Sequence, residues 1–156
     1  MAAASLVLDD FLPFRLSYTS NLVSETVART YEALFGLSIP EWRLVAVVAE
    51  AGRITQGSIG QRTRMDKVTV SRAAIALVER GLMTRGPNAA DRRSHLLELT
   101  AAGRDLYAAV APKALELERR VFDRLGRDEV RRFAATLRRI DAAALEVFTE
   151  EHRGAA

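Results

Sequence analysis

Apolar residues recur at intervals of three and four positions along most of the chain, a periodicity typical of amphipathic helices. Glycine, proline and capping residues divide this pattern into six segments. The protein is therefore expected to be mainly α-helical. The predicted helices run from Phe11 to Phe35, for about a dozen residues between Ser38 and Gly52, from Gln56 to about Thr63, between Asp66 and Gly81, from Thr100 to Gly126, and from about Asp128 to Glu150.

Local signals support the ends of these helices. The tetrapeptide 38–41, Ser-Ile-Pro-Glu, is typical of a capping box, in which the serine and glutamate side chains accept hydrogen bonds from each other's backbone N–H groups. Thr55, Asp66 and Thr100 are good N-cap residues for the helices that follow them. Pro112 predicts a kink in the fifth helix, because proline removes one backbone hydrogen bond.

A different pattern separates the fourth and fifth helices. Leu82 to Arg85 and Ser94 to Leu99 are short strand candidates, and the Gly86-Pro87-Asn88 cluster between them is a strong turn signal. The strands would form a hairpin whose tip carries Arg92 and Arg93 into solvent. Two short helices joined by a tight turn and followed by a hairpin make a winged helix-turn-helix. The expected fold class is therefore mainly α with a small β-wing, flanked by long N- and C-terminal helices.

The helix predicted between Asp66 and Gly81 has two distinct faces. Arginine can pair with guanine in the major groove of DNA, serine can donate or accept, and a valine methyl can meet a thymine methyl. An ordinary amphipathic surface helix would show the same division into two faces. The packing face contains Val70, Ala73, Ala74, Leu77 and Val78. The opposite face contains Lys67, Val68, Ser71, Arg72 and Ile75.

The surroundings of this helix favour DNA recognition. A short helix with Ile59 expected inward precedes it, and Arg62 and Arg64 mark a turn of about 3–4 residues, the length that the motif requires. Residues 52–95 contain nine Lys or Arg and three acids, a net charge of +6, whereas the whole chain carries +3. Positive charge concentrated on a groove-shaped motif is expected of a nucleic-acid reader.

From Ser38 to Arg104 the chain resembles the MarR family of dimeric winged-helix transcription regulators. The motifs that carry the resemblance are E-W-R-L-V at 41–45, T-V-S-R at 69–72, R-G-L at 80–82 and D-R-R-S-H-L-L-E-L-T at 91–100. The resemblance implies that residues 69, 71 and 72 meet the major groove, and that Arg93 reaches into the minor groove with Asp91 orienting it. The residues predicted to contact DNA are Arg62, Arg64, Lys67, Val68, Thr69, Ser71, Arg72, Asp91, Arg92 and Arg93.

The resemblance also implies a domain organisation. Residues 1–156 form a single MarR-like domain, in which residues 38–100 make the winged helix-turn-helix and residues 11–35 and 101–150 make dimerisation helices. The terminal helices have continuous apolar stripes, and a two-fold homodimer would bury the parts that the chain itself does not cover. Two-fold symmetry places two recognition helices about one DNA turn apart, which predicts a pseudo-palindromic operator in double-stranded DNA.

A small aromatic or anionic effector is implied by the resemblance alone. Arg15 lies in an unusually apolar stretch, and its partner is either a ligand carboxylate or solvent or a protein acid. Trp42, the only tryptophan, is either a core residue or part of an effector cavity, because in such regulators the surface between the first two helices lines that cavity. The predicted function is a homodimeric repressor relieved by ligand. The alternative is a winged-helix DNA-packaging or protein-interaction module without a ligand response.

Composition argues against other classes of protein. The chain has no cysteine, and His95 and His152 lack the spacing of metal ligands, so we expect no catalytic residue, no metal site and no cofactor. No stretch approaches the roughly 20 apolar residues of a membrane span, and Met1 to Asp10 lacks the basic start of a signal peptide. We therefore expect a cytoplasmic protein that does not bind membranes.

Overall fold

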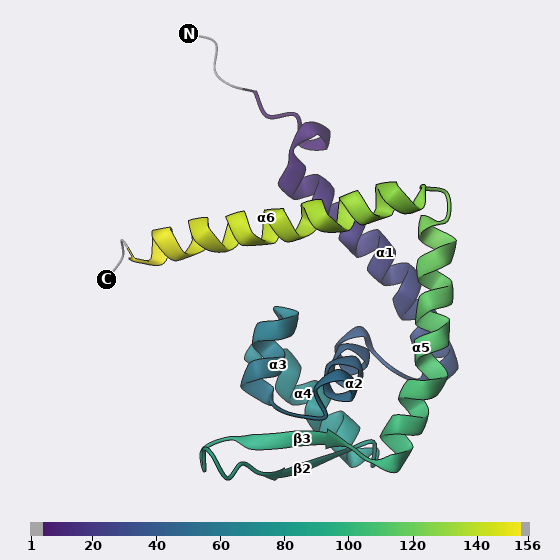
Figure 1. Ribbon diagram of the computed structural model, residues 1–156, viewed down its shortest axis with the longest axis vertical. Helices are drawn as coiled ribbons and strands as arrows, with labels where there is room; N and C mark the ends of the chain where they lie inside the picture. Colours follow the sequence, from purple (N-terminus) through teal and green to yellow (C-terminus); the bar gives the residue numbers. More distant parts are fainter. Residues whose placement is uncertain (1–4, 154–156) are drawn as a thin grey trace. The chain divides into compact units, whose positions relative to one another are not determined.

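The computed structural model describes residues 5–153 and consists of helices with one small antiparallel sheet (Figure 1). It divides into two compact units, one up to Leu115 and one from Glu116 onward, so each is described by itself. The elements in chain order are a 3-10 turn at Leu8–Asp10, α1 (Leu12–Phe35), α2 (Ile39–Ala51), β1 (Arg53–Thr55), α3 (Gln56–Thr63), α4 (Lys67–Glu79), β2 (Met83–Pro87), β3 (His95–Leu99), α5 (Ala101–Phe122) and α6 (Arg127–Arg153).

The first unit has a hydrophobic core between α2, α3, α4 and the sheet. The inward face predicted for α4 is confirmed, because its apolar residues at 70, 73, 74 and 77 are buried. The core residues of these elements are Leu44, Val45 and Val48 of α2, Ile54 of β1, Ile59 of α3, Val70, Ala73, Ala74 and Leu77 of α4, Met83 of β2, and Leu97 and Leu99 of β3. Apolar burial of this extent is the main stabilising contribution to the unit.

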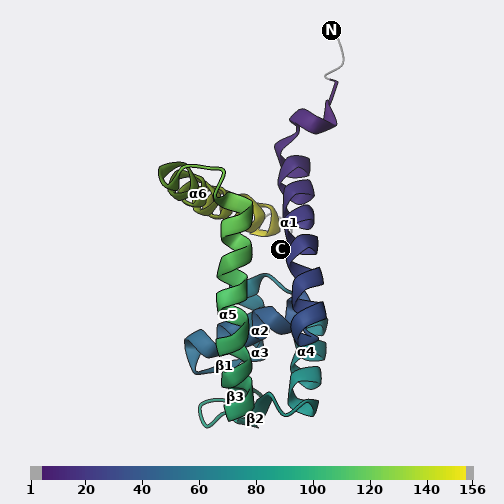
Figure 2. The ribbon, with the colours of Figure 1, turned by 90° about the vertical axis from the view of Figure 1, so that its right-hand side faces the viewer.

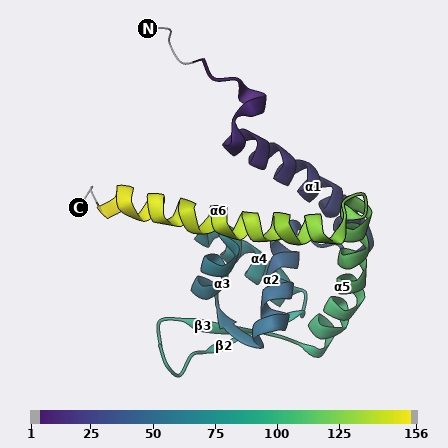
Figure 3. The same cartoon turned by 45° about the horizontal axis from the view of Figure 1, so that its top comes forward.

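The sheet contains three strands in the order β1-β3-β2, all antiparallel. The strand β1 was not predicted, because three residues are too few to show an alternating pattern. The turn predicted at residues 86–88 is wrong in position, since Gly86 pairs with Leu96 and Pro87 with His95 inside β2. Proline is tolerated there because β2 is an edge strand and its outer side needs no donor. The hairpin extends beyond the helices of the core (Figures 1 and 3).

The predicted helix caps are confirmed in the structure. Ser38 Oγ accepts from the backbone N–H of Glu41 at 3.3 Å, and Glu41 Oε2 accepts from that of Ser38 at 2.7 Å. Thr100 Oγ1 accepts from the backbone N–H of Gly103 at 3.0 Å, at the start of α5. Gly36 ends α1 with a φ of +61°, a left-handed conformation that glycine adopts without steric cost. Pro112 lies inside α5, which continues through it to Phe122.

The second unit consists of the last turns of α5 and the 27-residue α6. No residue of α6 is buried, although Phe133, Ile140, Leu145 and Phe148 are large and apolar. An apolar helix face that is left in solvent is typical of an interface. Within residues 5–153, none of the helices combines the length and the apolar character that crossing a bilayer would require.

Candidate nucleic-acid interface

The helix-turn-helix is formed by α3, a three-residue turn and α4. Thr55 Oγ1 caps α3 by accepting from the backbone N–H of Ser58 at 3.2 Å, as predicted. The turn begins at Arg64, whose φ of +57° reverses the chain after α3. The chain packs closely here, since a Cβ atom on Gly60 would lie 3.2 Å from the Met65 carbonyl oxygen. Gly60 was not singled out from the sequence, although an isolated glycine within a short helix is a signal of close packing.

Asp66 holds the first turn of α4 with two hydrogen bonds from one residue. Its Oδ1 accepts from the backbone N–H of Thr69 at 2.8 Å, and its Oδ2 accepts from the Thr69 hydroxyl at 2.7 Å. These bonds, the hydroxyl first, lower the pKa of the Asp66 carboxyl below its usual value. The Thr69 hydroxyl therefore donates its hydrogen bond to Asp66, and it can act toward a DNA base only as an acceptor.

The outer face of α4 is open to solvent in the described part of the chain. Val68 is 57% exposed and Ile75 is 48% exposed, on the side opposite the core. Lys67 and Arg72 are also exposed, and Ser71 is partly so. The face predicted to read DNA is thus accessible in this chain, and it carries both cationic and apolar side chains.

The wing tip between β2 and β3 is a folded loop. Asn88 donates from Nδ2 to Ser94 Oγ at 2.9 Å, and its Oδ1 accepts from the backbone N–H of Ala90 at 3.1 Å. Asp91 Oδ1 accepts from the backbone N–H of Arg93 at 2.9 Å. Asp91 thus positions Arg93 by binding the backbone N–H of Arg93. The side chains of Arg92 and Arg93 are exposed.

A cavity of about 490 Å³ with mostly polar lining residues lies between the wing, formed by β2 and β3, and the starts of α3 and α4. We call it the wing cavity. Arg85 and His95 face each other across the two wing strands, with 3.3 Å between Arg85 Nη2 and His95 Nδ1. Neither residue was predicted as part of the site, because strand periodicity does not show which side faces α4. The cavity is lined by Thr55, Gln56, Gly57, Lys67, Arg85, Asn88, Asp91, Arg93, Ser94 and His95.

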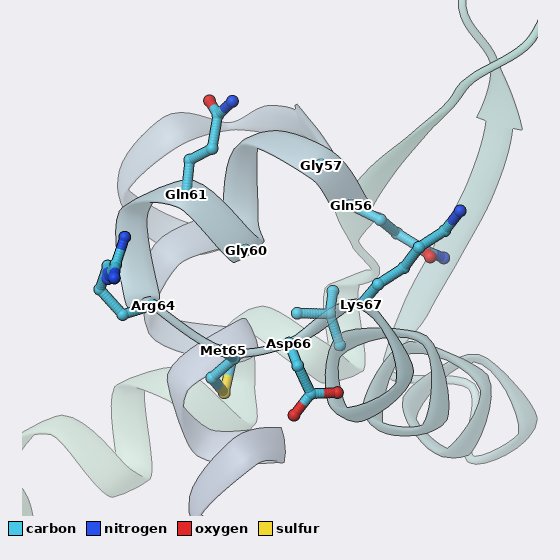
Figure 4. Close-up of a pocket in the computed structure, with 9 residues that line it drawn as sticks. Gln56, Gly57, Gly60, Gln61, Arg64, Met65, Asp66 and Lys67 are labelled. Carbon is cyan, nitrogen blue, oxygen red and sulfur yellow. The ribbon is translucent and has the colours of Figure 1, made fainter. Parts of the chain in front are cut away.

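A second cavity of about 490 Å³ lies along the turn between α3 and α4 (Figure 4). Figure 4 shows the side chains of Gln61, Arg64 and Lys67 around it. Gln56 lines both cavities, and its Nε2 is buried without a hydrogen-bond partner in the part of the protein that the structure describes. A buried amide donor without an acceptor carries a desolvation cost.

Protein groups hold several of the cations in residues 52–95, among them Arg53, Arg62 and Arg80. Arg53 Nε lies 3.3 Å from Glu98 Oε2, and Arg62 Nη2 lies 3.0 Å from Glu50 Oε2. Arg80 donates to backbone carbonyls at the end of α1. Part of the positive charge of residues 52–95 is therefore used in contacts within the protein, and the full net charge of +6 does not all face outward.

The two residues predicted as ligand contacts lie on different helices. Arg15 Nη1 lies 2.9 Å from Asp9 Oδ1, and its guanidinium carbon lies 5.3 Å from the centre of the Tyr18 ring. The sequence left a ligand carboxylate, solvent or a protein acid as the partner of Arg15, and in the structure the partner is a protein acid, Asp9. Trp42 is half-buried between Tyr31 and Tyr107, with ring centres 5.3 and 6.0 Å apart. Among residues 5–153, no hydrogen bond, ion pair or ring contact joins Arg15 to Trp42.

Comparison with known proteins agrees with this architecture. Residues 35–94 match a model described as MarR family. The transcriptional regulator HosA of Escherichia coli O157:H7 is 26% identical over 119 residues, which are 76% of this chain and 88% of HosA. Over these residues the chain is similar to members of the MarR family. HosA is named as a transcriptional regulator, and the winged helix fold of this chain agrees with that similarity.

Solved structures show the same fold over almost the whole chain. A MarR/EmrR family transcriptional regulator from Acinetobacter sp. ADP1 superimposes with a TM-score of 0.84 at 21% identity, covering 90% of this chain and 99% of that one. BpsR of Bordetella bronchiseptica, whose DNA binding is regulated by 6-hydroxynicotinic acid, has a TM-score of 0.80 at 20% identity, covering 88% and 98%. At these identities the likeness concerns the fold.

Proposed function

We propose that this protein is a homodimeric MarR-family repressor that binds a pseudo-palindromic operator, and that a small aromatic or anionic ligand weakens this binding. The observation that carries the proposal is the open outer face of α4 beside a wing cavity with basic walls. Helices of this kind read base edges in the major groove, while cations nearby neutralise phosphates.

The side chains of α4 divide into base readers and phosphate contacts. Arg72 has the fork geometry that pairs with guanine, Ser71 can donate or accept, and Val68 can meet a thymine methyl. The Thr69 hydroxyl already donates to Asp66, so it can accept a hydrogen bond from an adenine or cytosine amino group. Lys67 stands at the exposed start of the helix, where an ammonium group would meet a phosphate.

The wing and the turn supply the flanking contacts. Arg93 would enter the minor groove from the folded tip, and Arg92 would lie against the adjacent backbone. Arg85 and His95 line the wing cavity and are suited to phosphates of the strand between the two grooves. Arg62 is paired with Glu50 and would have to exchange that carboxylate for a phosphate.

The proposal of a homodimer is supported by apolar surface on the terminal helices. Leu12 and Leu22 of α1 are exposed, as are Phe133, Ile140 and Phe148 of α6. A two-fold interface would remove both surfaces from water and set two recognition helices in a fixed relation. Obligate interfaces of this kind are apolar, like the interior of a domain.

The proposal of an aromatic ligand is supported by the three rings that join α1, α2 and α5. Trp42 is only half-buried between Tyr31 and Tyr107, and a cavity of about 310 Å³ borders Tyr107. Because Trp42 is the only tryptophan, its fluorescence reports a ligand at this position. A ligand lowers operator affinity only if it binds one conformation of the protein more tightly than the other.

The experiment is selection of DNA bound by the full chain from a random pool, followed by titration of the selected site at fixed salt. Arg72→Ala and Arg93→Ala should each weaken the selected site by about 1–3 kcal/mol and relax preference at defined positions. Arg53→Ala, which removes a surface ion pair outside both cavities, is the matched control. A packaging protein would instead yield no preferred sequence, and both variants would weaken all DNA equally. Repeating the titration with aromatic acids tests the effector.

A further inference from the structure

Arg80 joins the C-terminal ends of two helices that are far apart in the sequence. Its backbone N–H donates to the Ala76 carbonyl at 3.1 Å and so belongs to the end of α4. Its guanidinium donates from Nη1 to the Gly36 carbonyl at 2.9 Å and from Nη2 to the Phe35 carbonyl at 3.2 Å, at the end of α1. The sequence motif at 80–82 gave no indication of this contact, which depends on a partner more than 40 positions away.

The chemistry of the contact is specific to arginine. The last carbonyl groups of α1 have no N–H donor within the helix. A cation at this end also interacts favourably with the helix dipole. A guanidinium can donate to two carbonyls at once in a fixed fork, whereas an ammonium group cannot reproduce that geometry. Glu41 holds the same corner, since its Oε2 accepts from the Ser38 backbone N–H at 2.7 Å and its Oε1 lies 4.0 Å from Arg80 Nη1.

The remainder of α1 has few anchors in the first unit. Tyr31 and Leu37, close to its C-terminal end, are fully buried, whereas Leu12 and Leu22 are exposed. Figure 2 shows α1 extending well beyond α2 and α4. With 24 residues, α1 is about 36 Å long, so a tilt of about 5° at its C-terminal end moves its far end by about 3 Å. That displacement is close to the roughly 3.4 Å rise of one base pair.

We propose that Arg80 is a positioning residue that fixes the direction of α1 relative to the recognition helix α4, and thereby the separation between the two recognition helices of the dimer. This inference rests on the proposed function, because α1 is taken as a dimerisation helix. Arg80 touches no DNA in this arrangement. Its effect is on which operator spacing the dimer accepts.

The first experiment compares operators of different spacing. The full chain is titrated with the selected operator, with versions whose half-sites are moved closer or farther by one base pair, and with a single half-site. The wild type and Arg53→Ala should prefer the selected spacing by at least about fivefold. Arg80→Ala should lose most of this preference while its affinity for the single half-site changes by less than about twofold. Arg80→Lys, which keeps the charge but not the fork, should lie between them.

The second experiment measures the angle between the helices directly, without DNA. Because the chain has no cysteine, spin labels can be placed on Glu25→Cys in α1 and Ile75→Cys in α4, both exposed, and the labelled chain diluted with unlabelled chain. The distance distribution should be narrow in the wild type and Arg53→Ala, and broad in Arg80→Ala. Glu41→Gln should broaden it less.

If the wild type shows no preferred DNA sequence, the proposed function is overturned, but the distance test still applies. An equally narrow distribution in Arg80→Ala, or an equal loss at all spacings and at the half-site, overturns the inference.

Discussion

Replacing Gly103 with alanine tests how tightly α5 is joined to the end of the recognition helix. A Cβ atom on Gly103 would lie 2.0 Å from the Leu82 carbonyl oxygen and 3.2 Å from Leu99 Cδ2. An ordinary carbon–oxygen contact is about 3.3 Å, so the start of α5 and Leu82 must separate by about 1.3 Å. The same Leu82 carbonyl accepts from the Thr100 backbone N–H at 3.1 Å, and the Gly81 carbonyl accepts from the Thr100 hydroxyl at 2.7 Å.

The cost follows from these contacts. Overpacking costs about 1–3 kcal/mol, and weakening the two Thr100 hydrogen bonds adds about 1 kcal/mol each. The better helix propensity of alanine returns at most about 1 kcal/mol. We therefore expect Gly103→Ala to lower the free energy of unfolding by about 2–4 kcal/mol.

The assay is urea unfolding at one fixed protein concentration, so that any dimer contributes equally. Gly57→Ala is the matched control, because this exposed glycine also lies in a helix and its Cβ would meet only Thr55 Oγ1 at 4.0 Å. It should be neutral or stabilise by up to about 1 kcal/mol. Equal stability of Gly103→Ala and the wild type, within about 0.5 kcal/mol, would refute the close contact.

Three further predictions concern the caps and the DNA-facing surface. Hydrogen bonds from Thr69 lower the pKa of Asp66 in the folded state. This cap therefore stabilises the protein above the unfolded pKa of about 3.9, and its contribution is lost as the pH falls through the lower folded value. The difference in unfolding free energy between wild type and Asp66→Ala, measured by urea unfolding, should shrink below about pH 4. Ser38→Ala should cost about 1 kcal/mol in the same assay, since it removes one half of the capping box. Replacing thymine by uracil at single operator positions should weaken the wild type about fourfold where Val68 or Ile75 covers the methyl group, and should leave the matching alanine variant unchanged in a titration.

Short-range signals predicted most of the fold. The caps at Ser38, Thr55 and Asp66 are set by residues three positions apart, so the sequence contains both members of each interaction. The strand β1 depends on pairing with β3, more than 40 positions away, and three residues carry no pattern of their own. The position of the wing turn was wrong for a related reason. Gly86 and Pro87 favour a turn locally, but pairing with residues 95 and 96 extends the strand through them.

The candidate site was predictable on its helix and less so on its strands. Burial of one face of α4 leaves Val68 and Arg72 on the other, and helical periodicity alone specifies that division. The positions of Arg85 and His95 depend on which side of the hairpin faces α4, which only the packed structure shows. A count of charges assigned Arg80 to the basic surface, whereas its guanidinium binds carbonyls at the end of α1.

The C-terminal end of α4 is a junction between the recognition helix and both of its neighbouring long helices. Arg80 ties it to the end of α1, and the carbonyls of Gly81 and Leu82 tie it to the start of α5 through Thr100. These contacts use backbone atoms, which cannot move independently of the elements they belong to. A change in the angle between α1 and α5 must therefore strain this junction or rotate α4 with it. For that reason, a ligand or partner that acts on the long helices need not approach the DNA-facing surface to change how α4 meets an operator.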